Sequence, residues 1–156
     1  MIRKAEEKDI PRLIKLLRQV HDVHSSKRPD IFRVGSKKYN ENELRNILSN
    51  ETSPVFVAEL DSIVIGYAFC IYQSTKDDNS LMDRETLYID DLCVDETSRG
   101  KGIGKALFNY VKTFAENNGF NDIVLNVWEC NASAKKFYEK LGLVARKTVL
   151  ELNIIE

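Results

Sequence analysis

The stretch LYIDDLCVDETSRGKGIGKAL, residues 87–107, decides the fold that we predict for this chain. Up to Val94 it carries the apolar residues of a buried strand, and the polar residues Asp95 to Ser98 end that strand. Three glycines follow at alternate positions: Gly100, Gly102 and Gly104. Beyond them, apolar residues recur with the period of a helix: Leu107, Tyr110, Val111 and Phe114. We therefore predict a strand, a glycine-rich loop and a helix in succession.

A glycine-rich loop that opens a helix is suited to binding an anionic phosphate. The first-turn N–H groups have no partner inside the helix, and the helix dipole places positive potential at the same end. Glycine is needed because a Cβ would keep a phosphate away from the backbone. Arg99, Lys101 and Lys105 add positive charge. The sequence therefore predicts a diphosphate site in this loop.

The spacing of the loop excludes two common phosphate motifs. A P-loop, G-x-x-x-x-G-K-[ST], needs one more residue between the glycines and a hydroxyl where Ala106 stands. The dinucleotide fingerprint G-x-G-x-x-G fails because Leu107 takes the place of the last glycine. The pattern that fits is Arg99-x-x-Gly102-x-Gly104. A second motif follows along the chain: Asn131-x-x-Ala134-x-x-Phe137-Tyr138-x-x-x-Gly142.

Together the two motifs resemble the GNAT superfamily of acetyl-CoA-dependent N-acetyltransferases. Its signatures are [QR]-x-x-G-x-[GA] and N-x-x-[AS]-x-x-[FL]-Y-x-x-x-G-[FL]. The resemblance implies that the loop binds the pyrophosphate of acetyl-CoA or coenzyme A, and that the pantetheine arm lies along the central strand where a bulge opens the sheet. The implied cofactor-binding residues are Leu92, Cys93, Val94, Arg99, Gly100, Lys101, Gly102, Ile103, Gly104, Lys105, Asn131, Ala134 and Tyr138.

The resemblance also implies an acid and a base. Tyr138 would stand near the thioester sulfur as the general acid; the alternative is an aromatic side chain packed beside Phe137. The segment Tyr88–Leu92 is similar to one in diamine and related small-amine acetyltransferases, whose first acidic residue takes the proton. That residue is Asp90 here, with Asp91 as the second candidate.

Two arguments limit this choice of base. Alternate strand residues face opposite sides, so at most one of the two carboxylates faces the cofactor unless a bulge intervenes. The alternative is that both are strand-edge residues that pair with lysine or arginine, and Glu85 is a distant third candidate. The expected catalytic residues are therefore Tyr138, Asp90 and Asp91.

A polar segment between the first two helices is expected to shape the acceptor pocket, as the same region does in the family. His21 and His24 precede its stretch Arg28-Pro29-Asp30-Ile31-Phe32. A histidine base is conceivable here because the pKa of histidine lies near neutral. The alternative is a solvated loop with Phe32 in the core, and Trp128 is also an ordinary core candidate. The expected substrate-binding residues are His24, Asp30, Phe32, Asp90 and Trp128.

Composition favours one cytoplasmic domain over residues 1–156. Lys and Arg number 23 against 24 Asp and Glu, so no overall charge attracts nucleic acid or an anionic membrane. The first residues are too charged for a signal peptide, and the longest apolar run, 63–72, is half of the ~20 residues that a membrane helix needs. The three cysteines lie in apolar segments without metal-ligand spacing, so we expect reduced thiols and no metal.

The remaining elements follow from periodicity and capping residues. A helix should begin at the N-cap Asp9 and end near Asp22, and Asn40 with Glu43 forms a capping box for the next helix. The other expected elements are strands 1–5, 55–60, 63–72, 123–128 and 148–154, a helix ended by Gly119, and a helix 131–141 stopped by Gly142. This order predicts an α/β fold of the GNAT type, with a mixed sheet of about six to seven strands flanked by about four helices.

By resemblance, the chain is an N-acetyltransferase that moves an acetyl group to a primary amine of a small molecule or peptide within a ternary complex. Only 14 residues follow Gly142, so the far wall of the acceptor site is either open or supplied by a second copy in a homodimer. One alternative is a non-catalytic acyl-CoA-binding sensor on the same fold. A nucleotide-binding protein is the third hypothesis.

Overall fold

The computed structural model describes residues 1–155. The chain forms two compact units, residues 1–126 and 127–156, which are treated separately below. The first unit contains β1 (Ile2–Lys4), η1 (Glu7–Asp9), α1 (Ile10–Lys27), α2 (Glu41–Ser49), β2 (Val55–Leu60), β3 (Ile63–Thr75), β4 (Arg84–Val94), η2 (Glu96–Ser98), α3 (Ile103–Asn117) and β5 (Asp122–Leu125). The second contains α4 (Ala132–Lys140).

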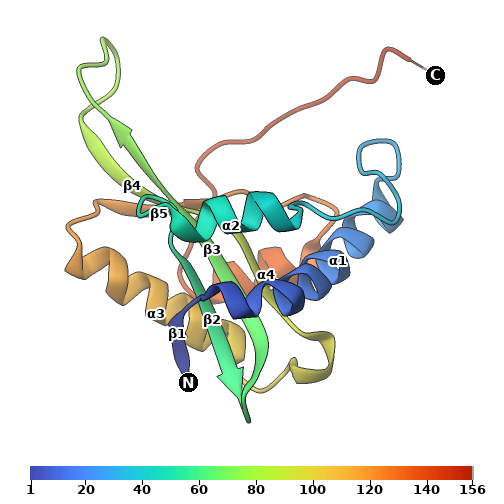
Figure 1. The fold of residues 1–156 in the computed structure, drawn as a ribbon. Helices are drawn as coiled ribbons and strands as arrows, with labels where there is room; N and C mark the ends of the chain where they lie inside the picture. The colour runs from blue at the N-terminus through green and yellow to red at the C-terminus, as the bar shows by residue number, and fades with distance from the viewer. Residues whose placement is uncertain (156) are drawn as a thin grey trace. The chain divides into compact units, whose positions relative to one another are not determined.

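One five-stranded sheet, in the order β1-β2-β3-β4-β5, organises the first unit (Figure 1). The neighbours from β1 to β4 are antiparallel, whereas β4 and β5 are parallel. The predicted hairpin between β2 and β3 is confirmed, and its turn residues Asp61 and Ser62 have φ of 50° and 63°. Such positive values at both positions are typical of the tight turn that matches the strand twist.

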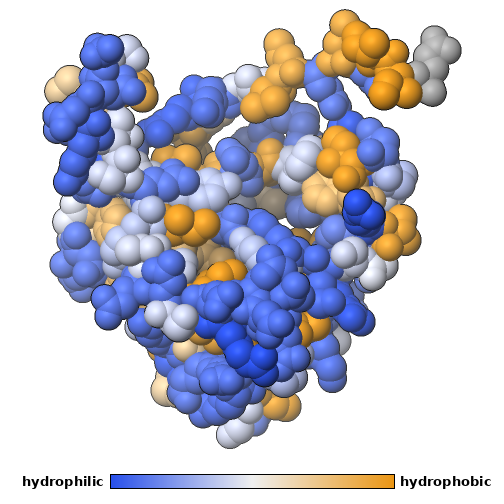
Figure 2. Space-filling model, turned by 45° about the horizontal axis from the view of Figure 1, so that its top comes forward, coloured by the Kyte–Doolittle hydropathy of each residue, from blue (hydrophilic) through white to orange (hydrophobic). Residues whose placement is uncertain are grey.

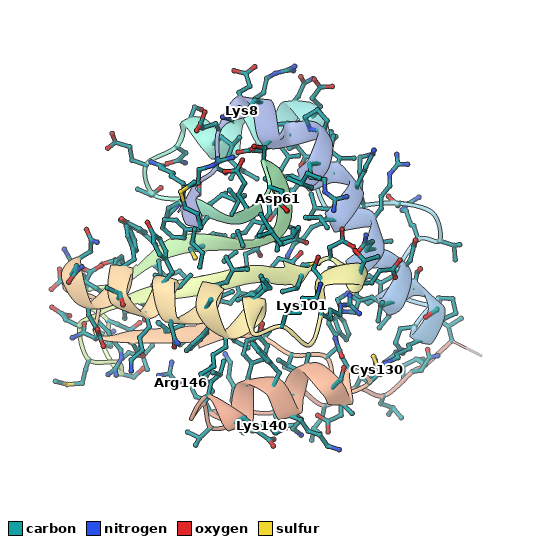
Figure 3. The ribbon with its side chains drawn as sticks, turned by 90° about the horizontal axis from the view of Figure 1, so that it is seen from below. Lys8, Asp61, Lys101, Cys130, Lys140 and Arg146 are labelled. Atoms are coloured by element: carbon teal, nitrogen blue, oxygen red, sulfur yellow. The ribbon has the colours of Figure 1, made fainter. Side chains whose placement is uncertain are left out.

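The alternation of apolar residues on the inner strands places a helical layer on each face of the sheet. On β2, Val55 and Val57 belong to the core beneath α1 and α2, while Phe56 packs its ring against Phe114 of α3 at 5.1 Å. Figure 3 shows the sheet between these two layers. The larger core contains the fully buried residues Leu13, Leu16, Leu17, Leu44, Val57 and Tyr67.

The predicted end of the first helix is wrong. α1 runs to Lys27 rather than ending near Asp22, so His24 lies in the last turn of a helix and not in a loop. Asp9 is the N-cap residue of α1, as predicted, but its side chain makes no capping hydrogen bond. Its carboxylate accepts instead from the Glu6 N–H at 2.8 Å and from Arg3, and so stabilises the preceding turn. Burial alone would raise the pKa of Asp9, but the Arg3 and Glu6 hydrogen bonds hold it below its ordinary value.

Other end signals are confirmed. Asn40 and Glu43 form the reciprocal capping box at the start of α2, and Gly119 adopts φ of 74° just after α3. β5 ends at Leu125, earlier than the predicted Trp128. None of the helices in the described part of the chain is both long and apolar enough to cross a membrane.

In the second unit, Asn131 begins α4 by accepting a hydrogen bond from the Ala134 N–H at 3.3 Å. The predicted closing strand 148–154 is wrong, because the described residues from 143 onward form no strand. The sheet therefore has five strands rather than six or seven. Alternation makes a segment competent for strand formation, but a strand also needs a ladder partner. Between residues 148 and 155, five large apolar side chains are 82–88% exposed: Val149, Leu150, Leu152, Ile154 and Ile155. Figure 2 shows hydrophobic side chains on this segment's surface.

Candidate active site

The glycine-rich loop leaves the start of α3 open to a ligand. Gly102 is the N-cap with φ of 78°, and no side chain caps the helix. At both Gly100 and Gly102 a built Cβ would meet no atom of the described chain within 4 Å, so backbone conformation and not packing requires glycine there. Lys101 lies in this loop, close to the first turn of α3 (Figure 3). This loop therefore fits the phosphate group that the sequence predicts.

The loop is tied to the body of the unit through Asp95. This buried carboxylate at the end of β4 accepts from Arg12 of α1, from Gln19 Nε2 at 3.3 Å and from the Thr97 N–H at 3.3 Å. Burial alone would raise the pKa of Asp95, but these hydrogen bonds lower it below its ordinary value. The Arg12 Nε in turn donates to the Val64 carbonyl at 2.8 Å. An ionised, multiply bonded Asp95 therefore fixes where the loop begins.

β4 loses its parallel partner midway along its length. The ladder with β5 runs only from Thr86 to Ile89, which pairs with Leu125. From Asp91 to Val94 the strand is paired with β3 alone within the described chain. The sheet thus opens on this side of β4 beyond Ile89, where Leu92, Cys93 and Val94 have no ladder partner on β5. The Arg99 side chain bonds back to the Val94 carbonyl at 3.1 Å.

A bulge on the other side of β4 sits at the same place. Phe69 pairs with Asp91 and Cys70 with Ile89, which leaves Asp90 as the extra residue. A bulge of this kind breaks the alternation of faces. Asp90 contacts Tyr39 and Asp91 contacts Tyr67, and both tyrosines pack in the core beneath α1 and α2. The two carboxylates therefore share one face of the sheet.

Asp90 is held by two side chains from the segment that precedes α2. The Tyr39 hydroxyl donates to Oδ2, and Lys38 Nζ donates to Oδ1 at 3.0 Å and to the backbone carbonyl at 3.1 Å. Burial and the bond to Asp90 raise the pKa of Tyr39 above its usual range, so this phenol remains a donor. This pairing with lysine agrees with the alternative hypothesis, in which Asp90 is a strand-edge residue that pairs with a basic side chain. A carboxylate that holds an amine is also what a general base for amine attack requires.

Asp91 is a partly buried carboxyl with a shifted titration. It accepts a 2.8 Å hydrogen bond from the Tyr67 hydroxyl. Burial raises the pKa of Asp91 to about 6, although Lys38 and the Tyr67 bond oppose this change. A carboxyl that titrates near neutrality beside a second carboxyl is a recognised mark of a functional site. Cys93, beside it, is inert because burial raises the pKa of its thiol to about 12.

The predicted acceptor-pocket residues are only partly brought together. His24 stacks on Phe32 with ring centroids 5.1 Å apart, and burial lowers the pKa of His24, helped by the nearby charges of His21 and Lys38. Asp30 forms an exposed ion pair with Arg28 at 2.8 Å. Trp128 lies in the second unit and is 40% exposed.

Glu85, the third candidate for the general base, lies on the β3–β4 hairpin and accepts a hydrogen bond from the Ser74 hydroxyl at 2.7 Å.

The second unit carries the other motif. Asn131, Ala134 and Tyr138 are spaced so that they share one face of α4. The Tyr138 ring contacts the neighbouring Phe137 at 5.1 Å, and both side chains are partly buried. Their roles toward coenzyme A and its sulfur stay predictions.

Sequence reasoning missed the residues that position the carboxylates: Lys38, Tyr39, Tyr67 and Arg12. The position of Tyr67 on an alternating apolar strand was a usable signal, since an inward tyrosine needs a polar partner. No local signal marks Lys38 or Tyr39, because their contacts with Asp90 join segments far apart in the chain.

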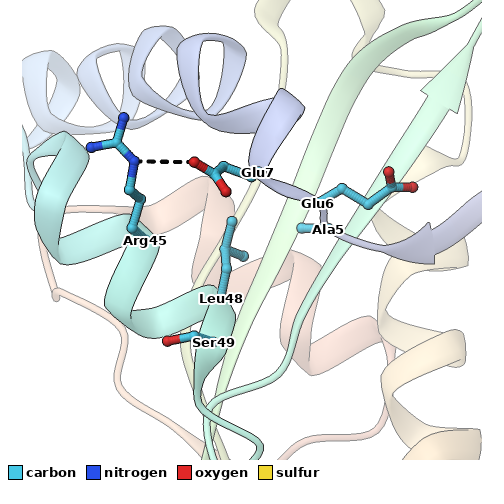
Figure 4. A pocket seen from close by; sticks show the side chains of 6 residues that line it. All are labelled: Ala5, Glu6, Glu7, Arg45, Leu48 and Ser49. Atoms are coloured by element: carbon cyan, nitrogen blue, oxygen red, sulfur yellow. Dashed lines mark hydrogen bonds and ion pairs between the residues drawn. The ribbon is translucent and has the colours of Figure 1, made fainter.

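A separate surface hollow lies between η1 and α2 (Figure 4). It is lined by Ala5, Glu6, Glu7, Arg45, Leu48 and Ser49, and Arg45 bonds to Glu7 across it at 3.2 Å. It shares no residue with the glycine loop or the carboxylates, and its exposed ion pair contributes little to stability.

Comparison with known proteins identifies the family of this chain. An uncharacterized N-acetyltransferase from Lactobacillus delbrueckii subsp. lactis is 26% identical over 143 residues, which cover 90% of this chain and 82% of that protein. The crystal structure of a mutant of the BH1408 protein from Bacillus halodurans has a TM-score of 0.96 and 33% identity over 99% of both chains. The aminoglycoside N-acetyltransferase AAC(6')-Iy in complex with CoA covers 98% of both chains with a TM-score of 0.73; at 18% identity it shows the fold alone. The sequence model of the Acetyltransferase (GNAT) family matches residues 17–143. The chain therefore belongs to the GNAT acetyltransferase family.

Proposed function

We propose that the protein transfers the acetyl group of acetyl-CoA to a primary amine of a small molecule or peptide, by direct attack in a ternary complex. One observation carries this proposal. β4 leaves β5 after Ile89 at the very place where the bulge turns Asp90 and Asp91 to one face. An open strand edge thus leads from the glycine loop to two carboxylates.

Bound acetyl-CoA would supply an activated thioester. The N–H groups at the start of α3 would hold its phosphates, helped by Arg99, Lys101 and Lys105. The open backbone of Leu92, Cys93 and Val94 would hold the pantetheine arm. Alignment of two reactants in this way is worth roughly 7–11 kcal/mol of the barrier. The CoA complex of AAC(6')-Iy, which shares the fold, supports this choice of cofactor.

Asp90 would take the proton from the attacking amine. Its Oδ2 accepts from the Tyr39 hydroxyl, which fixes the carboxylate, and its Oδ1 holds the Lys38 ammonium at 3.0 Å, which the attacking amine would have to displace. Asp91 adds negative charge on the same face, and the pair favours a cationic acceptor. Tyr138 would protonate the leaving thiolate; the family motif around it supports this role.

We further propose that residues 1–156 act as one domain in the cytoplasm, where the three cysteines, which form no disulfide, stay reduced. The exposed apolar segment from Val149 to Ile155 favours a homodimer, because it offers side chains that a second copy could bury.

The proposed function is tested by measuring thiol release from acetyl-CoA against a panel of polyamines, aminoglycosides and lysine peptides. We expect release with cationic amines, and mass spectrometry should find the acetylated product. Tyr138→Phe should lower the turnover number roughly 100-fold while the dissociation constant for acetyl-CoA changes little. Tyr110→Phe is the matched control, since Tyr110 packs on Phe56 at the surface of α3 and should leave both values unchanged.

The failures are distinct. Binding of acetyl-CoA with no thiol release on any amine supports the sensor alternative. Thermal stabilisation by ATP or NAD but not by acetyl-CoA supports a nucleotide-binding protein. An unchanged rate in Tyr138→Phe contradicts only the role of that phenol.

A further inference from the structure

Lys38 is a primary amine that already sits on the proposed general base. Its Nζ donates to Asp90 Oδ1 at 3.0 Å and to the Asp90 carbonyl at 3.1 Å. The Asp90 side chain is only 13% exposed, whereas that of Lys38 is 42% exposed. The amine therefore reaches a recessed carboxylate from the solvent side, as an external acceptor would have to do.

The position of this amine along β4 matters. Asp90 is the bulged residue, and the open strand edge begins there and ends at Val94, just before the glycine loop. Four residues of strand span about 13 Å. An arm that starts from phosphates at the loop and runs along this edge therefore brings its far end toward Asp90. The reactive end and the Lys38 amine would meet at the bulge.

The surroundings of Asp90 leave one oxygen for the amine. The Tyr39 hydroxyl holds Oδ2, and Tyr39 itself rests on Phe69 with ring centroids 5.7 Å apart. Oδ1 is the oxygen bound by Lys38 and is therefore the atom that can accept its proton. Asp91, on the same face, bonds to Tyr67 rather than to Lys38.

We propose that Lys38 is an internal acetyl acceptor, so that the protein acetylates its own Lys38 when no external amine is present. This inference rests on the proposed function. Asp90 Oδ1 takes a proton from the Lys38 ammonium, and the freed nitrogen attacks the thioester carbonyl. The N–C bond forms, the nitrogen gives up its second proton, the C–S bond breaks, and coenzyme A leaves as the thiol that carries this second proton. No oxidant or further reactant is needed.

An external amine and Lys38 would then compete for the same carboxylate. A cationic acceptor that binds Asp90 displaces the Lys38 ammonium and slows self-acetylation. Acetylation makes the Lys38 side chain neutral, which removes its ion pair with Asp90. The modified chain therefore keeps Asp90 free of its internal partner.

The test is to incubate the purified protein with deuterated acetyl-CoA and no amine, and to follow intact mass and peptide mass over time. We expect a gain of one labelled acetyl group per chain, located at Lys38, at a rate that does not depend on protein concentration. Lys38→Arg should lose this gain while keeping the charge, and Asp90→Asn should slow it roughly 100-fold. Lys112 is the matched control, because it also pairs with a carboxylate, Glu116 at 4.0 Å, and is 60% exposed.

Unassisted chemistry would modify the more exposed Lys112 at least as fast as Lys38, and that result would overturn the inference. Label confined to Lys38 that is unaffected by Asp90→Asn would also overturn it. If wild-type protein acetylates external amines but leaves Lys38 unlabelled, this inference fails and the proposed function stands. If neither external amines nor Lys38 are acetylated, the proposed function fails as well.

Discussion

Asp91 is a carboxyl that the fold keeps partly out of water beside a second carboxyl. Its bond from Tyr67 and the nearby Lys38 favour the charged form, yet burial outweighs them and raises its pKa to about 6. At neutral pH the ionised, partly buried Asp91 carboxylate therefore lowers the free energy of unfolding. Sites of catalysis commonly carry such a cost because a base is most useful when its pKa lies near the working pH.

This shift predicts how stability depends on pH. The folded carboxyl keeps its proton up to about pH 6, whereas the unfolded one loses it near its ordinary value of 3.8. The stabilisation from the neutral form is therefore complete below the lower value and is lost as pH rises through the higher one. Asp91→Asn should be more stable than wild type by about 3 kcal/mol at neutral pH, with no such gain at about pH 4. Urea unfolding over this range measures the difference.

Asp9→Asn is the control for this prediction. Asp9 is also a buried carboxyl, but its pKa is lowered by Arg3 and Glu6. Its replacement should therefore destabilise the protein at neutral pH, and the loss should shrink in acid. An Asp91→Asn gain that is the same at every pH would contradict the assigned titration.

At the scale of elements, the sequence predicted those helix ends that depend on a few neighbouring residues. The capping box of Asn40 and Glu43 and the left-handed Gly119 were readable because they depend on a few neighbouring residues. The order of strand, glycine loop and helix around residues 87–107 was also predictable, and Asp90 and Asp91 lie on that strand. The sequence could not predict that Asp90 and Asp91 share a face, because the bulge depends on pairing with β3.

The C-terminal segment shows the opposite case. Its strand-like alternation could be recognised in the sequence, but whether another strand pairs with it could not. Its alternating residues suit a strand, yet no ladder forms for them in the described chain, and five large apolar side chains remain 82–88% exposed. Burial of such a side chain is worth roughly 1.5–3 kcal/mol. Addition of a strand to a second copy would recover that energy.

We therefore predict that the protein is a dimer whose dissociation constant rises at least about 100-fold in the double variant Leu150→Glu, Leu152→Glu. Sedimentation equilibrium measures this change. Exposed Leu81, on the β3–β4 hairpin, supplies the control variant Leu81→Glu, which should leave the association unchanged. A monomeric wild type, or a dimer unaffected by the double variant, would contradict the proposal.

At the scale of the whole molecule, the central claim joins three features into one line. The start of α3 offers uncapped N–H groups, the end of β4 offers an open edge, and the bulge offers two carboxylates. Asp95 fixes the loop to α1, so the distance from the first feature to the last is set by the fold. This arrangement aligns acetyl-CoA with the carboxylates only if the glycine loop holds the phosphates of coenzyme A.

Calorimetric titration of coenzyme A into wild type, Gly102→Ala and Gly119→Ala tests this claim most directly. Both glycines flank α3 with nearly equal φ, 78° and 74°, and a Cβ meets nothing within 4 Å at either. The two changes should therefore cost similar stability, roughly 1–2 kcal/mol. We predict that only Gly102→Ala weakens coenzyme A binding, by at least about tenfold. Equal affinity in the two variants would contradict the account.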